Sequence, residues 1–393
     1  MIARIFPLLL AAVLASAVSA GATDPAIQAL ARDVVGVGQG VYVVAEDGTV
    51  LASEAADRAV HPASVTKIAT SLALLQRLGP DYRFTTRLLA TGPIEAGVLR
   101  GDLIVDAGND PFLVDEGAAL ILRRLHELGI RSVTGGLAVR GALVFDWERD
   151  PAGTRFARAL GGNLGTVWRD DDGWPPLRDA KLEFGRPAVK RETAGGTLLL
   201  TYRSPPLLAI LKALNGYSNN VFHFASDTIG GPPAVAKATA AAVSPDYADE
   251  IVIDNGAGGG TVNRLSPRVA VATIDALRRE LGRLGRDLTA VLPVSGIDPG
   301  TLRERLLAPP AGRGIVVGKT GTYGSEGACG LAGALRTTRH GIVTFAVLNR
   351  GVAVPEARRR QNAFVEKLAA ALGAEPWKYT APAAPAFGQA LIE

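Results

Sequence analysis

The sequence predicts an α+β protein whose main antiparallel sheet is assembled from both ends of the chain, with a smaller α/β domain inserted between them. Near the N-terminus, residues 40–54 alternate apolar and polar side chains on both sides of Asp47-Gly48, a strong hairpin signal. Near the C-terminus, residues 314–351 contain three short apolar runs separated by turns, and residues 355–373 have helical periodicity. Two early and three late strands predict one five-stranded sheet flanked by helices.

The middle of the chain has a different pattern, which predicts a separate unit. Strands are expected near residues 83–90, 103–106 and 132–139, and a helix over 117–128. Residues 146–195, which include WRDDDGWPP, match no regular element. The expected organisation is a signal peptide at 1–20, a discontinuous main domain at 21–85 and 200–380, an inserted domain at 86–199, and a Pro- and Ala-rich flexible tail at 381–393.

The first twenty residues are typical of a secretory signal. Arg4 is followed by an apolar run that is too short to span a membrane comfortably, and Val18-Ser19-Ala20 fits a small-residue cleavage site. The mature protein is therefore expected to be soluble and exported. Cys329 is the only cysteine, so no intramolecular disulfide can form, and stability must come from the hydrophobic core.

The charge pattern excludes some partners and singles out the lysines. The net charge of +4 is small for 393 residues, and no basic run is longer than 358–360, so nucleic-acid binding is not expected. A mild attraction to an acidic polymer such as a cell wall stays open. Only eight of the 42 basic residues are lysines. Because arginine is the usual cation in this chain, a lysine can indicate a position that requires a proton-exchanging amine, which a permanently charged guanidinium cannot supply.

The segment HPASVTKIATSLALLQRLGP, residues 61–80, places a serine and a lysine on one face of a predicted helix. Pro62 lies in the first turn, and Gly79 ends the apolar periodicity. Ser64 and Lys67 are three residues apart, so their side chains can come within hydrogen-bonding reach. A neutral lysine amine could take the serine proton, and both burial and a second nearby cation would favour that neutral form.

Two further motifs follow in order. Ser218-Asn219-Asn220 alone is typical of a turn or helix cap, and Lys319-Thr320-Gly321 alone could simply end a strand. Together with Ser64 and Lys67, they match the serine, lysine, Ser-x-Asn and Lys-Thr-Gly set of penicillin-binding proteins and serine β-lactamases. On a strand, Gly321 would let a substrate backbone approach closely.

Other catalytic machineries find no support. No G-x-S-x-G elbow, phosphate-binding loop or dinucleotide fingerprint occurs. The four histidines are scattered without zinc-site spacing, and Cys329 is expected to be a buried packing thiol. The histidines are interpreted as structural: His61, His126, His223 and His340.

With these motifs, most of the chain resembles the penicillin-binding protein 4 type of D-alanyl-D-alanine carboxypeptidase and endopeptidase, peptidase family S13. Further collinear segments carry the resemblance: LGPDYRFTTRLLATG, LIVDAGNDPFL, LGIRSVTGGLAV, IDNGAGG, VNRLSP and LPVSGIDPGTL. The resemblance implies a β-lactamase/transpeptidase-like domain, with a five-stranded antiparallel sheet, flanking helices and a helical subdomain. It also implies an inserted domain between the first two motifs.

The resemblance assigns roles to individual residues. Ser64 would be the acylated nucleophile and Lys67 its base, while Ser218 would relay the proton and Asn220 would orient the substrate amide. Lys319 would hold the charge network. The substrate-binding set would be Thr320, Gly321 and Thr322, with the backbone N–H groups of Ser64 and Thr322 as oxyanion hole.

The sequence departs from the family pattern at two places. His223-Phe224 stands where Ala-Glu is common, two residues after the Ser-x-Asn motif. In the glycine-rich segment, Ala257 replaces a usual serine, and residues 259–261 read Gly-Gly-Thr where Leu-Ser-Arg is usual. These differences are expected to affect substrate preference more than acylation.

The expected function is that of a periplasmic serine D-Ala-D-Ala carboxypeptidase that acts on peptidoglycan stem peptides and is inhibited covalently by β-lactams. Endopeptidase action on cross-links is a further possibility. No metal or organic cofactor is expected, and association with membrane or wall should be peripheral at most. Two alternatives stay open: a β-lactamase or esterase on the same scaffold, and a non-catalytic wall-binding protein. The oligomeric state is left open.

Overall fold

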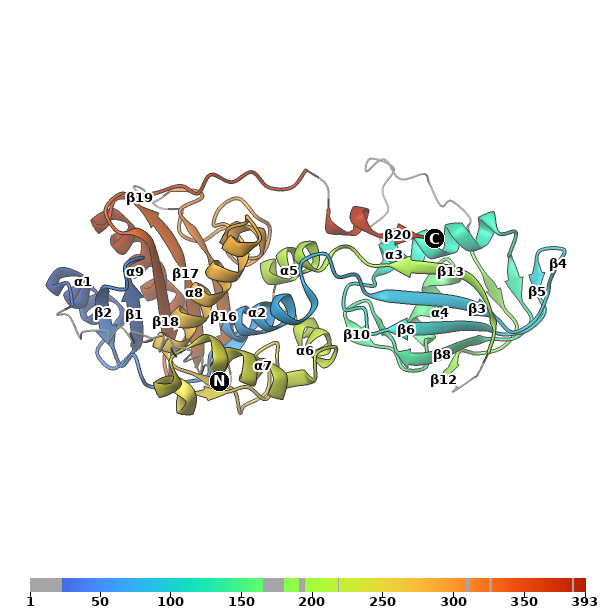
Figure 1. Ribbon diagram of the computed structural model, residues 1–393, viewed down its shortest axis with the longest axis horizontal. Helices are drawn as coiled ribbons and strands as arrows, with labels where there is room; N and C mark the ends of the chain where they lie inside the picture. Colours follow the sequence, from blue (N-terminus) through green and yellow to red (C-terminus); the bar gives the residue numbers. More distant parts are fainter. Residues whose placement is uncertain are drawn as a thin grey trace, which may run out of the picture.

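The computed structural model describes residues 23–164, 180–190, 195–217, 219–307, 312–324, 327–383 and 385–393. These residues form an elongated molecule with two lobes (Figure 1). The left lobe in this view contains the early strands β1 and β2 (residues 40–54) and the late strands β16, β17 and β18 (residues 316–349). The right lobe contains the middle of the chain. The predicted signal peptide lies outside the described residues.

The left lobe is built on the five-stranded antiparallel sheet that the sequence predicts. Its order is β16 (Val316–Tyr323), β17 (Ala328–Thr337), β18 (Gly341–Asn349), β1 (Gly40–Val44) and β2 (Val50–Glu54). Early and late strands meet where β1 pairs with β18, with Gly40 opposite Leu348. A short strand, β19 (Ala374–Glu375), adds to β17 as a sixth member.

Helices cover both faces of this sheet. One face carries α1 (Pro25–Leu30), the π-helical turn η1 (Ala31–Val35) and α9 (Val354–Ala371). The other carries α2 (Thr66–Leu78) and α8 (Pro267–Arg283). Alternation along β17 explains both contacts, because Leu331 packs in the α9-side core and Ala332 in the α2-side core. The helical subdomain beside α2 consists of α5 (Leu207–Gly216), α6 (Val221–Asp227) and α7 (Gly231–Ala242).

The right lobe is a separate α/β unit with its own core. Its larger sheet has the order β12 (Val189–Lys190), β8 (Leu137–Ala142), β6 (Leu103–Gly108), β3 (Thr85–Ala90), β13 (Thr197–Arg203) and β20 (Leu391–Ile392). A smaller sheet has the order β11 (Glu183–Phe184), β7 (Ser132–Val133), β5 (Val98–Leu99) and β4 (Ile94–Glu95). The helices α3 (Asp115–Glu127) and α4 (Thr154–Leu160) pack on each other in this lobe.

The segment that the sequence left unassigned, residues 146–195, contributes α4, β11 and β12, together with β10 (Glu148–Arg149), which pairs with β9 (Val144–Phe145). The motif WRDDDGWPP lies outside the described residues. The remaining short elements are η2 (Ala63–Val65), η4 (Pro245–Glu250), β14 (Ile251–Val252), β15 (Arg264–Leu265), η5 (Leu288–Ala290) and η7 (Ala386–Gln389).

The last residues of the predicted flexible tail form a short strand. The C-terminal segment runs from the left lobe to the right lobe, where β20 pairs with β13 (Figure 1). Thr201 and Glu393 exchange two backbone hydrogen bonds of 2.9 Å, and Arg203 Nε lies 2.9 Å from Glu393 Oε1. The open edge of β13 accounts for the order, because an unpaired strand edge can bind any extended segment.

No helix in the described ranges is both long and apolar enough to cross a lipid bilayer.

Candidate active site

Ser64 lies in a short turn that leads directly into α2. The turn η2 precedes the helix, which begins at Thr66, so Pro62 lies before the helix and not in its first turn as predicted. Thr66 Oγ1 donates a hydrogen bond of 2.9 Å to the carbonyl of Ala63. Ala63 has a φ of 49°, a left-handed conformation that is uncommon for a residue with a side chain. The half-buried Ser64 is thus held at the start of a helix by a constrained backbone.

Three glycines allow neighbouring backbones to close on this turn. A Cβ added at Gly321 on β16 would lie 2.6 Å from the Pro62 carbonyl oxygen, and one at Gly330 on β17 would lie 3.2 Å from the same oxygen. Gly258 approaches from a loop, where an added Cβ would lie 1.9 Å from the Ala63 carbonyl oxygen. The turn that carries Ser64 is therefore in direct backbone contact with the sheet.

Lys67 contacts the nucleophile directly and is fully buried. Its Nζ donates hydrogen bonds to Ser64 Oγ at 2.7 Å and to the Ala257 carbonyl at 3.1 Å. The ring of Phe222 lies behind it, 5.9 Å from Nζ. Burial, and to a lesser extent the charge of Lys319, hold the pKa of Lys67 well below its ordinary range. A neutral amine at this distance can accept the serine proton.

Lys319 is the second lysine of the site and is also fully buried. Its Nζ donates a hydrogen bond of 3.1 Å to the carbonyl of Thr320. Burial lowers the pKa of Lys319 to about 8. Within the ranges that the structure describes, no carboxylate forms an ion pair with Lys67 or Lys319. With Lys67 neutral, Lys319 therefore supplies a positive charge beside Ser64 that no carboxylate in these ranges compensates.

The strand that carries Lys319 presents an open edge. β16 is the outermost strand of its sheet, and only its first half is covered, because the Val316 carbonyl and the Gly318 N–H bond residues 293–295. Backbone groups alternate along a strand, so the N–H groups of Thr320 and Thr322 point toward the same edge. Thr322 is exposed. An extended peptide could therefore pair with this end of β16.

The second motif contributes Asn220, which lies beside the glycine-rich loop. Asn220 immediately precedes α6, and its carbonyl accepts the His223 N–H at 3.0 Å. A Cβ added at Gly259 would lie 3.6 Å from Asn220 Oδ1, so the amide faces the glycine-rich loop that also supplies Ala257. Ser218 lies outside the described residues. Its predicted role stays a prediction.

The Ala257 carbonyl is a site group that the sequence interpretation missed. It accepts the hydrogen bond from Lys67, and Ser64 Oγ lies 3.5 Å from the same oxygen. The loop is fixed by its own side chains, since Asn255 Oδ1 accepts the Ala257 N–H at 2.9 Å and the Asn263 side chain bonds the backbone of Asn255. A backbone carbonyl has no residue signature, so no sequence motif could have indicated it.

His61 fixes the turn rather than acting on the nucleophile. Its Nδ1 accepts the Ala63 N–H at 3.1 Å, so Nε2 carries the proton and donates to the Gly260 carbonyl at 2.8 Å. The ring stacks on Tyr323 at the end of β16, with 4.3 Å between ring centroids. His61 thus joins the turn, the glycine-rich loop and the strand. This agrees with the structural role that was predicted for it.

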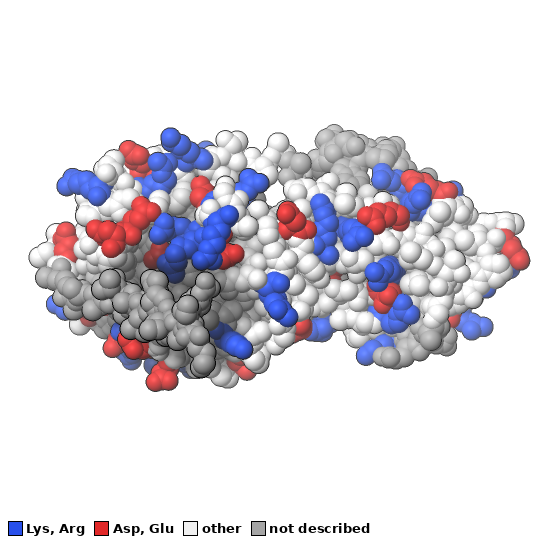
Figure 2. Space-filling view, in the orientation of Figure 1, with Lys and Arg blue, Asp and Glu red and all other residues white. Residues whose placement is uncertain are grey.

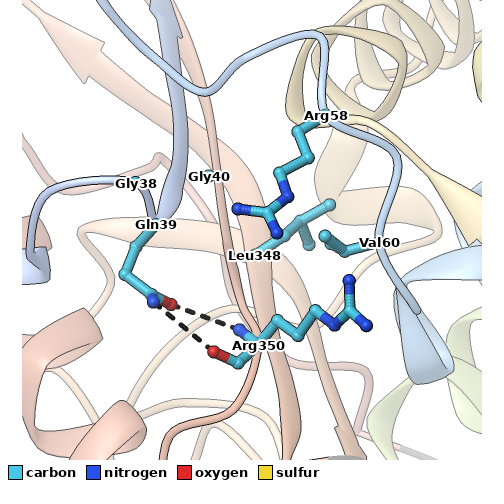
Figure 3. Close-up of a pocket in the computed structure, with 7 residues that line it drawn as sticks. All are labelled: Gly38, Gln39, Gly40, Arg58, Val60, Leu348 and Arg350. Atoms are coloured by element: carbon cyan, nitrogen blue, oxygen red, sulfur yellow. Dashed lines mark hydrogen bonds between the residues drawn. The ribbon is translucent and has the colours of Figure 1, made fainter.

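A small pocket lies apart from these residues. Figure 3 shows Arg58 and Arg350 beside Val60 and Leu348, while the Gln39 side chain bonds the backbone of Arg350. None of the predicted site residues lines it. Among the described residues, no group of three or more His, Cys, Asp or Glu side chains could hold a metal ion.

The surface charge is mixed. Figure 2 shows basic and acidic side chains interspersed over this face of both lobes. A face of this kind has no extended basic stripe of the type that tracks a nucleic-acid backbone.

Comparison with protein families gives a match over most of the chain. The profile of the D-Ala-D-Ala carboxypeptidase 3 (S13) family matches residues 14–152 and 185–371. Carboxypeptidase DacB of Mycolicibacterium smegmatis is 26% identical over 365 residues, which cover 82% of this chain and 78% of that protein. D-alanyl-D-alanine carboxypeptidase DacB of Haemophilus influenzae is 30% identical over 108 residues, covering 28% of this chain and only 20% of that relative.

Solved structures show the same fold. The Bd0816 predatory endopeptidase of Bdellovibrio bacteriovorus superimposes with a TM-score of 0.73 at 21% identity, covering 88% of this chain and 97% of that one. Penicillin-binding protein 4 of Haemophilus influenzae gives a TM-score of 0.64 at 19% identity, covering 88% and 99%. These likenesses confirm the predicted β-lactamase/transpeptidase-like fold class.

Proposed function

The chain belongs to the D-Ala-D-Ala carboxypeptidase 3 (S13) family, and on this premise we propose that it is a serine D-Ala-D-Ala carboxypeptidase that acts on peptidoglycan stem peptides. One observation carries the proposal: Lys67 Nζ lies 2.7 Å from Ser64 Oγ in a site that contains two buried lysines. A serine and a neutralised lysine at this distance form a nucleophile–base pair.

The proposed reaction begins with proton transfer from Ser64 Oγ to the neutral Lys67 amine. Oγ attacks the carbonyl of the penultimate D-Ala, and the backbone N–H groups of Ser64 and Thr322 stabilise the oxyanion. The C–N bond then breaks, and the terminal D-Ala leaves as an amine after receiving a proton. In this scheme Ser218 relays that proton, and Asn220 orients the substrate amide. Water hydrolyses the acyl-enzyme.

Substrate binding is proposed at the open edge of β16. An extended peptide would pair with the backbone of Thr320 and Thr322, and Gly321 leaves no side chain in the way. Burial keeps Lys67 neutral, and the charge of Lys319 adds to this effect; Lys319 also favours an anionic peptide terminus. β-Lactams resemble the same peptide and would acylate Ser64. A Bdellovibrio bacteriovorus endopeptidase of this fold is known in a penicillin G-acylated form.

The place of action follows from the substrate. We infer an extracytoplasmic, periplasmic protein, with residues 1–20 as its secretory signal. Endopeptidase action on cross-links would use the same site and the same acyl-enzyme.

The intact mass of the mature protein, measured after brief and long incubation with a penicillin, tests the proposal. A persistent single adduct in the wild type, lost in Ser64→Ala, is the expected result. A transient adduct with rapid destruction of the drug would instead identify a β-lactamase. Failure to form any adduct, together with no release of D-Ala from a stem peptide, would refute catalysis and favour the wall-binding alternative.

A further inference from the structure

Successive side chains of β16, the strand that carries Lys-Thr-Gly, lie on opposite faces of the sheet. Lys319 and Gly321 face the α2 side of the sheet, where a Cβ added at Gly321 would lie 3.0 Å from the Ser64 backbone nitrogen. The next residues alternate to the α9 side. There Thr322 Oγ1 accepts a hydrogen bond of 3.0 Å from Arg358 Nη2. The exposed end of β16 is therefore in contact with an arginine that the proposed mechanism does not use.

Arg358 is the first of three consecutive arginines on α9, and it differs from the other two. Arg359 and Arg360 both bond Glu356, and these hydrogen bonds lower the pKa of the Glu356 carboxyl to about 2. Arg358 turns away from that carboxylate and toward Thr322. Across the described ranges of the chain, no carboxylate forms an ion pair with it. Its charge is exposed and uncompensated.

A second arginine adds positive charge nearby. Arg305 bonds only neutral groups, with Nε 2.9 Å from Asn362 Oδ1 and Nη2 3.1 Å from Gln361 Oε1. Burial, together with the nearby charge of Arg358, lowers the pKa of Arg305 to about 10. The two bonded residues lie on α9, one turn beyond Arg358, so Arg305 also fixes the position of that helix.

Cations therefore lie on both sides of β16, and within the described part of the protein no carboxylate forms an ion pair with them. Lys319 lies on one face of the strand, Arg358 contacts Thr322 on the other face, and Arg305 is bonded to α9 one turn beyond Arg358. Such a field favours binding of a negatively charged group. Only Arg358 both contacts an exposed residue of the strand and can offer a free guanidinium edge, which suits the two oxygens of a carboxylate.

We propose that Arg358 is a specificity-determining residue that, together with Thr322, binds the free carboxylate at the end of the scissile peptide. The inference rests on the proposed function and deepens it. Binding at this position places the carboxylate one residue beyond the bond that Ser64 attacks. A substrate without that charge would lose the contact, so Arg358 would select peptides and β-lactams that carry a free carboxylate.

The test compares acylation by benzylpenicillin with acylation by its methyl ester, measured as second-order rate constants from intact mass. Arg358→Gln should slow the reaction with benzylpenicillin by about 10- to 100-fold and leave the reaction with the ester nearly unchanged. Arg358→Lys should recover part of the loss, since lysine restores the positive charge but cannot bind both carboxylate oxygens as a guanidinium does. Arg359→Gln, on the same helix but bonded to Glu356, is the matched control and should change neither rate.

A second readout uses a stem peptide that ends in D-Ala-D-Ala. Arg358→Gln should raise KM for D-Ala release more than it lowers kcat, because the contact is made before bond cleavage. Equal slowing of penicillin and ester, or no slowing of either in a variant with an unchanged unfolding midpoint, would overturn the inference alone. A wild-type protein that is neither acylated nor releases D-Ala would overturn the proposed function, and the inference with it.

Discussion

The contact between β16 and the turn that carries Ser64 makes Gly321→Ala a demanding test of the site. The added Cβ would lie 2.6 Å from the Pro62 carbonyl oxygen and 3.0 Å from the Ser64 nitrogen. Non-bonded heavy atoms pack best at about 3.5 Å, so the methyl group must push strand and turn apart by about 1 Å. A displacement of about 1 Å in a catalytic group can cost roughly 100-fold in rate. Acylation should fall by that factor.

The assay is the second-order rate constant for labelling by a fluorescent penicillin, with the thermal unfolding midpoint measured on the same samples. Gly324→Ala is the matched control, because it lies just beyond β16 and a Cβ there would meet nothing within 4 Å. The control should label like the wild type. A folded Gly321→Ala protein that labels within about threefold of the wild-type rate would refute the argument that this close approach positions Ser64.

Three further predictions concern buried charges. Burial raises the pKa of Asp110 from 3.8 to about 7, so the folded state holds this proton more tightly than the unfolded state, and stability should fall by about 3 kcal/mol between about pH 5 and pH 8. Asp110→Asn should remove most of that slope in urea unfolding, and an unchanged slope would contradict the assignment. Asp298 bonds Lys212 Nζ at 2.6 Å and Tyr379 Oη at 2.7 Å, so Asp298→Ala should cost about 3 to 5 kcal/mol, whereas a loss below about 1 kcal/mol would show that the ion pair is replaced by water. Acylation should rise with pH and level off below the ordinary lysine range, because the pKa of Lys67 is lowered; Lys67→Arg should abolish it, and a variant that still acylates would overturn the assigned base.

Much of the main sheet follows from local patterns in the sequence. The alternation around Asp47-Gly48 predicts β1 and β2, and the three late apolar runs predict β16, β17 and β18. Each strand is long enough for its period of two to be visible. The two-residue strand β20 has no such period. Its order comes from the free edge of β13, about 190 positions earlier in the chain, and a local pattern contains no information about that edge.

The site likewise contains residues that could be predicted from the sequence and groups that could not. Ser64, Lys67 and Lys319 could be found because their chemistry resides in the side chains, and the structure brings all three together. The carbonyl of Ala257 could not, since any residue supplies that group. The role of Arg358 was equally hidden, because a run of three arginines on a helix is typical of a solvated surface. Only the packing of α9 on the sheet brings it to Thr322.

The pairing of β1 with β18 also has a consequence for biosynthesis. Gly40 lies opposite Leu348, so the central strand pair joins residues that leave the ribosome far apart in time. Because distant pairings form slowly and only after both partners are available, a nascent chain holds Ser64 and Lys67 long before it can position them. The right lobe takes most of its strands from an uninterrupted stretch and can begin to fold earlier. Enzyme activity should therefore emerge only with completion of the polypeptide, which keeps an unfinished chain from attacking peptides or being trapped by a β-lactam.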